Sequence, residues 1–258
     1  METWRTAIVD AGPDHIRVRG HDVLDLMRGA TFTDLIFLLH HQRVPTAAER
    51  RLIDAILVGS ADHGAGAPSC AAARLAASGN RQSPSAAIAA GVLTIGDEHG
   101  GAGSSCMALI AATLERSRRD ERALDETARL VVDEARAAKT RLPGFGHRVH
   151  ATIDPRVDVL FGLAEESGLA GDGVRVVRAL ERAIAERIKP LPINIDGALA
   201  AILVDLGFPP LMGMLLFVIA RVAGISAEVL EEHLREKPMR IRIPVEYDGV
   251  PPVDGGVS

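Results

Sequence analysis

From Asp22 onward the chain repeats apolar residues at the three- and four-residue spacing of amphipathic helices, and proline, glycine or a capping residue interrupts each repeat. Aromatic residues make up only 3% of the chain, whereas alanine, leucine, valine and isoleucine are abundant. Small aliphatic side chains favour closely packed helices over a strand-rich sandwich. We therefore predict an all-α fold, preceded by a small hairpin or an ordered arm over residues 1–20. The predicted helices lie near residues 23–27, 33–39 (capped by Thr33), 45–57, 69–77, 85–94, 107–114, 120–139, 161–167, 174–188, 198–206, 210–224 and 227–237 (capped by Ser226).

Composition excludes several classes of protein. The 258 residues are enough for a substantial core, and the formal net charge of −5 without a basic run argues against a nucleic-acid partner. The two cysteines, Cys70 and Cys106, form no Cys-x-x-Cys pair and no zinc-ligand spacing is present, so we expect a reduced, cytoplasmic protein without a metal. The longest apolar run, residues 211–220, is about half of the roughly 20 residues that a membrane span needs. We therefore expect a buried helix there, no membrane association, and no secretory signal at the N-terminus.

The segment Leu142–Val149 places a histidine and an arginine side by side on a loop that proline and two glycines shape, and a second arginine follows at Arg156. A histidine titrates near neutral pH, and an arginine can hold a carboxylate through two parallel bonds. The segment is either a solvated surface loop or an anion site with a proton donor.

Three further positions suit proton transfer. Asp196 precedes an apolar helix, so it is the N-cap of that helix, a general base shielded from water, or both. His99, next to Gly100 and Gly101, is either a hydrogen-bonded histidine at a helix boundary or a neutral donor that stabilises an enolate oxygen. His63, also beside a glycine, is open to the same two interpretations.

Three arginines near the C-terminus raise different questions. Arg221 ends an apolar helix, and a charge at such a place needs a structural carboxylate or a bound substrate as its partner. Arg240 and Arg242, judged alone, are surface charges. The sequence contains no Gly-x-Ser-x-Gly turn, which argues against a serine nucleophile.

Taken together and in this order, three segments resemble the catalytic blocks of the citrate synthase superfamily. The likeness runs from about residue 55 to residue 249. Within the superfamily the chain is short and is most similar to a stand-alone citryl-CoA lyase. The blocks are Glu98–Ala102, Gly144–Val149 with Asp154–Arg156, and Asn194–Gly197, and the likeness includes Ala220–Val222 and the tail Arg242–Gly249.

One comparison within the superfamily leaves the reaction open. The runs Ala61–Gly64 and Leu93–Asp97 are similar to the citryl-CoA-cleaving module of ATP-citrate lyase. That module has a histidine at the position of Ala71 and an apolar residue at that of His99, whereas His99 in this chain follows the synthase pattern. The resemblance therefore implies a lyase or a synthase.

The resemblance assigns roles to individual residues. It implies that Asp196 exchanges the α-proton of the acetyl thioester, that His99 holds the thioester oxygen, and that His147 exchanges a proton with the oxygen of the oxaloacetate carbonyl or citryl hydroxyl. It implies no metal. The substrate carboxylates would bind to His63, Arg148, Arg156, Arg221 and, across the interface of a homodimer or higher homo-oligomer, Arg242. The adenine end of coenzyme A would bind to the backbone of Leu142, Pro143, Gly144, Phe145 and Gly146.

The activity implied by the resemblance is reversible cleavage of citryl-CoA to acetyl-CoA and oxaloacetate. The alternatives are a condensing enzyme similar to citrate synthase or 2-methylcitrate synthase, and a CoA-binding homologue without turnover. The implied architecture is a large helical domain of residues 1–114 with 209–258, and a smaller helical CoA-binding domain of residues 115–208 that closes over the site.

Overall fold

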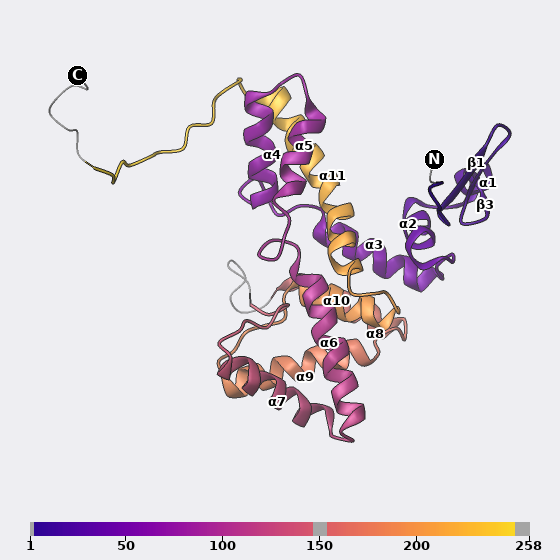
Figure 1. The fold of residues 1–258 in the computed structure, drawn as a ribbon, viewed down its shortest axis with the longest axis vertical. Coiled ribbons are helices and arrows are strands. Elements are labelled where there is room, and N and C mark those ends of the chain that lie inside the picture. Colours follow the sequence, from indigo (N-terminus) through magenta and orange to yellow (C-terminus); the bar gives the residue numbers. More distant parts are fainter. Residues whose placement is uncertain (1–2, 147–153, 251–258) are drawn as a thin grey trace.

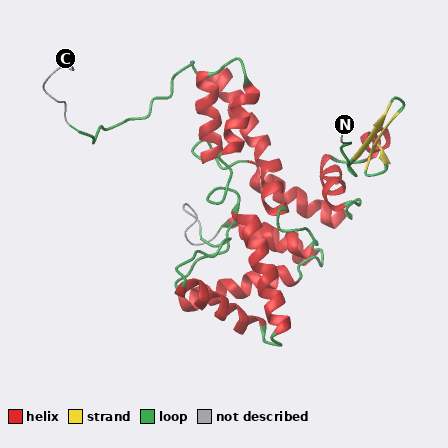
Figure 2. Cartoon of the chain, viewed as in Figure 1, coloured by secondary structure: helices red, strands yellow, loops and turns green. Residues whose placement is uncertain are grey.

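The computed structural model describes residues 3–146 and 154–250 and confirms the all-α prediction (Figures 1 and 2). A small antiparallel sheet lies at the N-terminal end, with Val9 opposite Val18 and Arg17 opposite Asp22. The strands are β1 (Val9–Gly12), β2 (His15–Val18) and β3 (His21–Asp22). The helices are α1 (Val23–Gly29), α2 (Phe32–His41), α3 (Ala47–Ala61), α4 (Pro68–Gly79), α5 (Pro84–Leu93), α6 (Ala102–Arg119), α7 (Leu124–Ala137), α8 (Pro155–Glu166), α9 (Asp172–Arg187), α10 (Ile195–Asp205) and α11 (Met212–Arg235).

Capping residues set where several helices begin. Thr31, not Thr33, caps α2, because its hydroxyl accepts from the Asp34 N–H at 3.2 Å while the Asp34 carboxylate accepts from the Thr31 N–H at 2.8 Å. The predicted cap Thr33 is buried and donates to Asp54 instead. Thr46 makes the same reciprocal pair with Glu49 at the start of α3.

Within the described part of the chain, the buried apolar side chains form two clusters. The larger one joins α2, α3, α6 to α10 and the first turns of α11, and Phe37, Ile56, Leu180 and Leu199 are among its fully buried members. The smaller one joins α4, α5 and the second half of α11 through alanine, isoleucine and valine side chains. The predicted domain boundary at residues 114 and 115 falls inside α6, and the division into two domains stays a prediction.

Helix α11 corrects the prediction of two helices split near Gly224 and Ser226. It is continuous over 24 residues and packs on α3, α4, α5, α6 and α10. Gly224 marks a helix crossing, because a Cβ there would lie 2.1 Å from the carbonyl oxygen of Ala61. The Ser226 hydroxyl donates to the carbonyl of Ala223 within the helix and caps nothing.

Among the described residues, α11 is the one helix whose length and composition would let it cross a membrane. Its most apolar window has a mean hydropathy of 1.9, and 44% of that window is buried inside the molecule. Arg221 and Glu232 are buried within α11 and are in contact with protein groups. Helices packed in a protein core pass the same test, so this feature is weak evidence for a membrane span.

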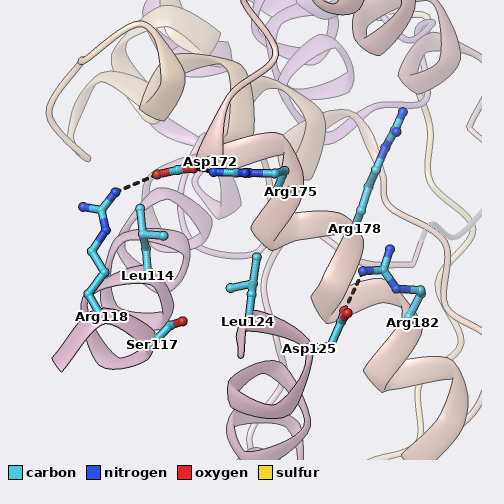
Figure 3. Close-up of a pocket in the computed structure, with 9 residues that line it drawn as sticks. All are labelled: Leu114, Ser117, Arg118, Leu124, Asp125, Asp172, Arg175, Arg178 and Arg182. Carbon is cyan, nitrogen blue, oxygen red and sulfur yellow. Dashed lines mark hydrogen bonds and ion pairs between the residues drawn. The ribbon is translucent and has the colours of Figure 1, made fainter. Parts of the chain in front are cut away.

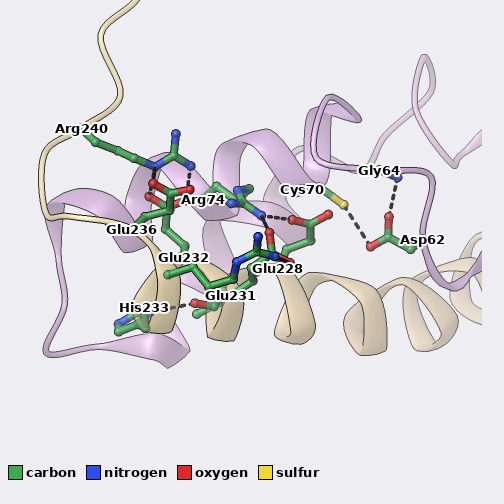
Figure 4. A network of polar contacts seen from close by, with 12 residues as sticks. Asp62, Gly64, Cys70, Arg74, Glu228, Glu231, Glu232, His233, Glu236 and Arg240 are labelled. Carbon is green, nitrogen blue, oxygen red and sulfur yellow. Dashed lines mark hydrogen bonds and ion pairs between the residues drawn. The ribbon is translucent and has the colours of Figure 1, made fainter.

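An ion-pair network joins α4 to the end of α11 (Figure 4). Arg74, 8% exposed, binds Glu228, Glu231 at 3.3 Å and Glu232 at 3.1 Å. Arg240, predicted as a surface charge, donates from Nε to the fully buried Glu232 at 3.0 Å. Beyond this anchor, the chain runs away from the helices in an extended and largely exposed segment (Figure 1).

Candidate functional site

The loop Leu142–Gly146 lies against the N-terminus of α10. Its backbone pairs with residues 192–194, since the Asn194 N–H donates to the Gly144 carbonyl at 3.0 Å and the Gly146 N–H donates to the Pro192 carbonyl at 2.8 Å. Gly144 has φ +89°, and a Cβ there would lie 2.6 Å from the sulfur of Cys106 on α6. The loop therefore approaches α6 and α10 more closely than a residue with a side chain could.

Asp196 lies in the first turn of α10 and does not cap this helix, so of its possible roles the N-cap is ruled out. The cap is Asn194, whose side-chain oxygen accepts from the N–H groups of Asp196 at 3.0 Å and Gly197 at 3.1 Å. Because Asn194 accepts from these N–H groups, the Asp196 carboxyl does not cap the helix. Its Oδ1 is buried without a hydrogen-bond partner.

The surroundings of Asp196 set its proton affinity. Burial raises the pKa of its carboxyl from 3.8 to about 6, while the charges of Arg156 and Arg221 oppose that rise. Burial, with the neighbouring Asp196 carboxyl, raises the pKa of the Cys106 thiol to about 12, so this thiol stays protonated. A shielded carboxyl that titrates near neutral pH suits proton exchange with a weakly acidic carbon.

His99 is held by the first turn of α4. Its Nε2 accepts from the backbone N–H of Ser69 at 3.3 Å and lies 2.9 Å from the Ser69 hydroxyl. A backbone N–H can only donate, so in the neutral ring the proton resides on Nδ1. Burial, together with the charge of Arg221, lowers the pKa of His99. This histidine is therefore a neutral donor through Nδ1.

Arg221 lies within α11 and not at a helix end as predicted. Its Nε donates to the carbonyl oxygen of Ser60 at 3.0 Å, and its guanidinium lies 4.8 Å above the ring of Phe217. The Phe217 ring also contacts the His99 ring edge-to-face at 6.0 Å. Arg221 is 3% exposed, and its terminal nitrogen NH1 is buried without a hydrogen-bond partner. Such a group favours binding of an anion.

Arg156 is more fully paired than Arg221. Its Nε and NH2 donate to the two carboxylate oxygens of Asp154 at 2.9 and 2.8 Å, and its NH1 donates to the carbonyl of Gly59 at 3.1 Å. Asp154 is 1% exposed and also accepts from the N–H of Ile195 at 3.1 Å. Arg156 is thereby connected to the helix that carries Asp196.

Of the other predicted site residues, Arg242 makes no contact with this group among the described residues. His63 is exposed on the segment between α3 and α4, and Arg242 is exposed on the C-terminal segment that leads away from the helices (Figure 1). His147 and Arg148 lie outside the described residues. The structure therefore gathers His99, Asp196, Arg156 and Arg221 around the loop and the ends of α3 and α10.

Two other features of the described residues bear on ligands. Asp62, Cys70 and Glu228 have potential metal-ligand atoms within 4.8 Å of one another, a grouping that sequence spacing did not indicate. Burial raises the pKa of the Cys70 thiol, and Glu228 is paired with Arg74. A protonated thiol and a neutralised carboxylate are poor ligands for a cation.

A hollow of about 560 Å³ lies between α6, α7 and α9 (Figure 3). Four arginines line it, but Arg118 binds Asp172 at 2.6 Å and Arg182 binds Asp125 at 2.6 Å. It includes none of the predicted site residues. We assign no ligand to this hollow.

Sequence reasoning assigned no role to Ser69, Asp154 or Phe217, although all three hold site residues in place. Ser69 and Phe217 contact His99, which is distant from both in the sequence, and the motif that contains Asp154 did not indicate that its carboxylate pairs with Arg156. Asn194 had a usable signal, because asparagine is as strong an N-cap as aspartate and it precedes Asp196 by two residues.

Comparison with known proteins identifies the family to which this helical fold belongs. The family model for the citrate synthase C-terminal domain matches residues 46–242. The chain therefore belongs to the citrate synthase family. The predicted resemblance is confirmed, and so, at the level of the family, is the prediction of an enzyme of the citrate synthase type.

Among solved structures, the chain is similar to the citryl-CoA lyase of Hydrogenobacter thermophilus, with a TM-score of 0.88 and 34% identity over 98% of this chain and 97% of that one. It is 31% identical to the citrate synthase of Helicobacter pylori, over 90% of this chain and 54% of the relative. An ATP citrate lyase from Methanosaeta concilii shares the fold, with a TM-score of 0.76 and 19% identity over 96% of this chain and 42% of that one. The chain spans about half the length of the curated citrate synthases that it matches.

Proposed function

We propose that this enzyme cleaves citryl-CoA to acetyl-CoA and oxaloacetate in a reversible reaction. The observation that carries the proposal is the Asp196 carboxyl, which is buried, lacks a partner at Oδ1 and has a pKa of about 6 beside two arginines. The similarity to the Hydrogenobacter thermophilus citryl-CoA lyase over nearly the whole of both chains supports this choice of reaction.

The proposed cleavage begins at the citryl hydroxyl, whose proton passes to His147, a residue outside the described part of the chain. As the carbonyl of oxaloacetate forms, the carbon-carbon bond breaks and its electron pair moves into the acetyl thioester as an enolate. The Nδ1–H of His99 donates to the enolate oxygen. Protonated Asp196 then transfers its proton to the enolate carbon, which completes acetyl-CoA.

The cations and the loop bind the ends of the substrate. We assign substrate carboxylates to Arg221, whose NH1 lacks a partner, and to Arg156, with His63 and Arg148 completing the set. The backbone of Leu142–Gly146 would bind the adenine end of coenzyme A. Arg242, exposed on its extended segment, would enter the site of a second subunit in a homodimer.

The reaction as written needs no metal ion, because His99 and the arginines supply the charge stabilisation. We place the enzyme in the cytoplasm, since both cysteines are buried free thiols and its relatives are metabolic enzymes.

The test is an assay of purified protein with citryl-CoA, in which oxaloacetate and acetyl-CoA should appear at the same rate with and without EDTA. Loss of the activity in EDTA would contradict the metal-free mechanism. No cleavage at any pH between 5 and 9 would contradict the proposal itself.

A condensing enzyme is the second candidate, and the curated citrate synthases favour it. Such an enzyme hydrolyses the citryl thioester, so acetyl-CoA and oxaloacetate should release free thiol. A thiol-trapping assay separates the two reactions, because a lyase retains coenzyme A in thioester form.

A further inference from the structure

One amide side chain joins the two halves of the proposed site. Asn194 accepts through Oδ1 from the N–H groups of Asp196 and Gly197, and it donates through Nδ2 to the carbonyl oxygen of Gly146 at 2.7 Å. The residue is 9% exposed, so both ends of the amide act in a largely water-free setting.

The backbone around Asn194 strengthens this link. Phe145 and Ile193 form an antiparallel bridge, and the N–H of Ile193 donates to the carboxylate of Glu181 at 2.9 Å. The segment that leads into α10 is thereby fixed to α9 on one side and to the loop on the other. The amide adds a side-chain bond from the same segment to the far end of the loop, at Gly146.

We propose that Asn194 is a positioning residue that couples the CoA-binding loop to the acid-base group Asp196. Its donor end holds the loop in the shape that receives coenzyme A, and its acceptor end holds the first turn of α10, which keeps the Asp196 carboxyl buried. This role rests on the proposed function. In this role Nδ2 of Asn194 holds the loop and Oδ1 caps α10. Substitutions can therefore remove the donor alone or the donor and the acceptor together.

Asn194→Ser keeps a side-chain oxygen that caps helices as well as asparagine does, but serine is too short to reach the Gly146 carbonyl. We expect the dissociation constant of coenzyme A to rise about fivefold, the usual effect of losing one neutral hydrogen bond. The pH at which kcat has its inflection should stay where the wild-type protein has it, because α10 remains capped.

Asn194→Ala removes the acceptor as well as the donor. The same loss of coenzyme A affinity is expected, and in addition the inflection of kcat should move to lower pH, because a frayed first turn admits water to Asp196. Ser83→Ala is the matched control, since it removes the side-chain cap of α5, a helix that contributes no residue to the proposed site. It should lower the melting temperature and leave both coenzyme A binding and the pH profile unchanged.

The measurements are calorimetric titration with coenzyme A and pH profiles of kcat for all four proteins. A wild-type protein that neither binds coenzyme A nor turns over citryl-CoA contradicts the proposed function, and the role of Asn194 with it. An active wild type whose Asn194→Ser variant binds coenzyme A normally overturns the coupling role alone. Identical pH profiles for the serine and alanine variants also overturn it.

Discussion

Replacing Asp196 with asparagine should make the protein more stable and nearly inactive at the same time. The variant removes a carboxylate from a buried site in which its Oδ1 has no hydrogen-bond partner. Most substitutions in a protein interior destabilise the fold, so stabilisation here is a specific expectation.

The magnitude follows from the pKa of Asp196, which burial raises from 3.8 to about 6. Between about pH 4 and pH 6 the folded protein holds a proton that the unfolded chain has released, so the wild-type free energy of unfolding falls as pH rises through this window. Above pH 6 the loss is complete, at about 3 kcal/mol for a shift of roughly two units. The Asp196→Asn variant recovers less than the whole 3 kcal/mol, because a buried amide that lacks a hydrogen-bond partner itself destabilises the fold by about 1 kcal/mol.

We therefore expect Asp196→Asn to melt about 4–8 °C above wild type at pH 7.5, from a net gain of about 2 kcal/mol in a chain of this length. The difference should shrink as pH falls toward 4, because the folded wild-type carboxyl is then protonated and no longer carries a buried charge. The rate of citryl-CoA cleavage should fall by about 10²- to 10⁴-fold, the usual contribution of a positioned proton-transfer group.

Asp205→Asn provides a control on the same helix. The Asp205 carboxylate accepts from the N–H groups of Gly171, Gly173 and Val174, so its loss should lower the melting temperature. Melting would be followed by circular dichroism or calorimetry at pH 4.5, 6 and 7.5. An Asp196→Asn variant that melts at or below the wild-type temperature at every pH would refute the argument from burial.

Three further substitutions test the supports of the site and fold. Ser69→Ala removes the hydroxyl beside His99, so kcat should fall about tenfold with no large change in melting temperature, by steady-state kinetics and calorimetry. Gly224→Ala places a Cβ 2.1 Å from the carbonyl oxygen of Ala61, and denaturant unfolding should show a loss of about 1–3 kcal/mol. Arg74→Met leaves the buried Glu232 and the partly buried Glu228 without one of their cations, so unfolding should show a loss of about 3 kcal/mol; an unchanged midpoint would contradict that account.

The sequence was sufficient for the helices because their apolar faces repeat locally, but it misplaced features that depend on contacts between distant segments. Gly224 resembles a helix end in the sequence, yet it lies inside α11 where the helix crosses the end of α3. Arg240 resembles a surface charge, yet it pairs with Glu232, which α11 places at full burial. Patterns of neighbouring residues do not predict such contacts between distant segments.

In the site, too, the sequence indicated the chemistry of individual residues but not their contacts. Residue type alone indicated that Asp196 and His99 could exchange and donate protons. From the sequence we considered Asp196 as a cap of α10 and did not consider Asn194, although both residue types are strong caps and they lie two positions apart. The sequence also did not reveal that Arg156 is already paired with Asp154, whereas the NH1 of Arg221 has no partner.

The end of α3 explains why the proton affinity of Asp196 should depend on bound substrate. The consecutive carbonyls of Gly59 and Ser60 accept from Arg156 and Arg221, and the charges of these two guanidiniums oppose the effect of burial on the Asp196 carboxyl. Substrate carboxylates that neutralise Arg221 remove part of that opposition, so the pKa of Asp196 should rise in the complex. Because kcat/KM reports groups in the free enzyme and kcat reports groups in the complex, the inflection of kcat should lie at higher pH than that of kcat/KM. An Arg221→Met variant that still turns over should show a smaller pH difference between the inflections of kcat and kcat/KM. Coincident inflections in the wild-type enzyme would show that bound substrate does not neutralise Arg221.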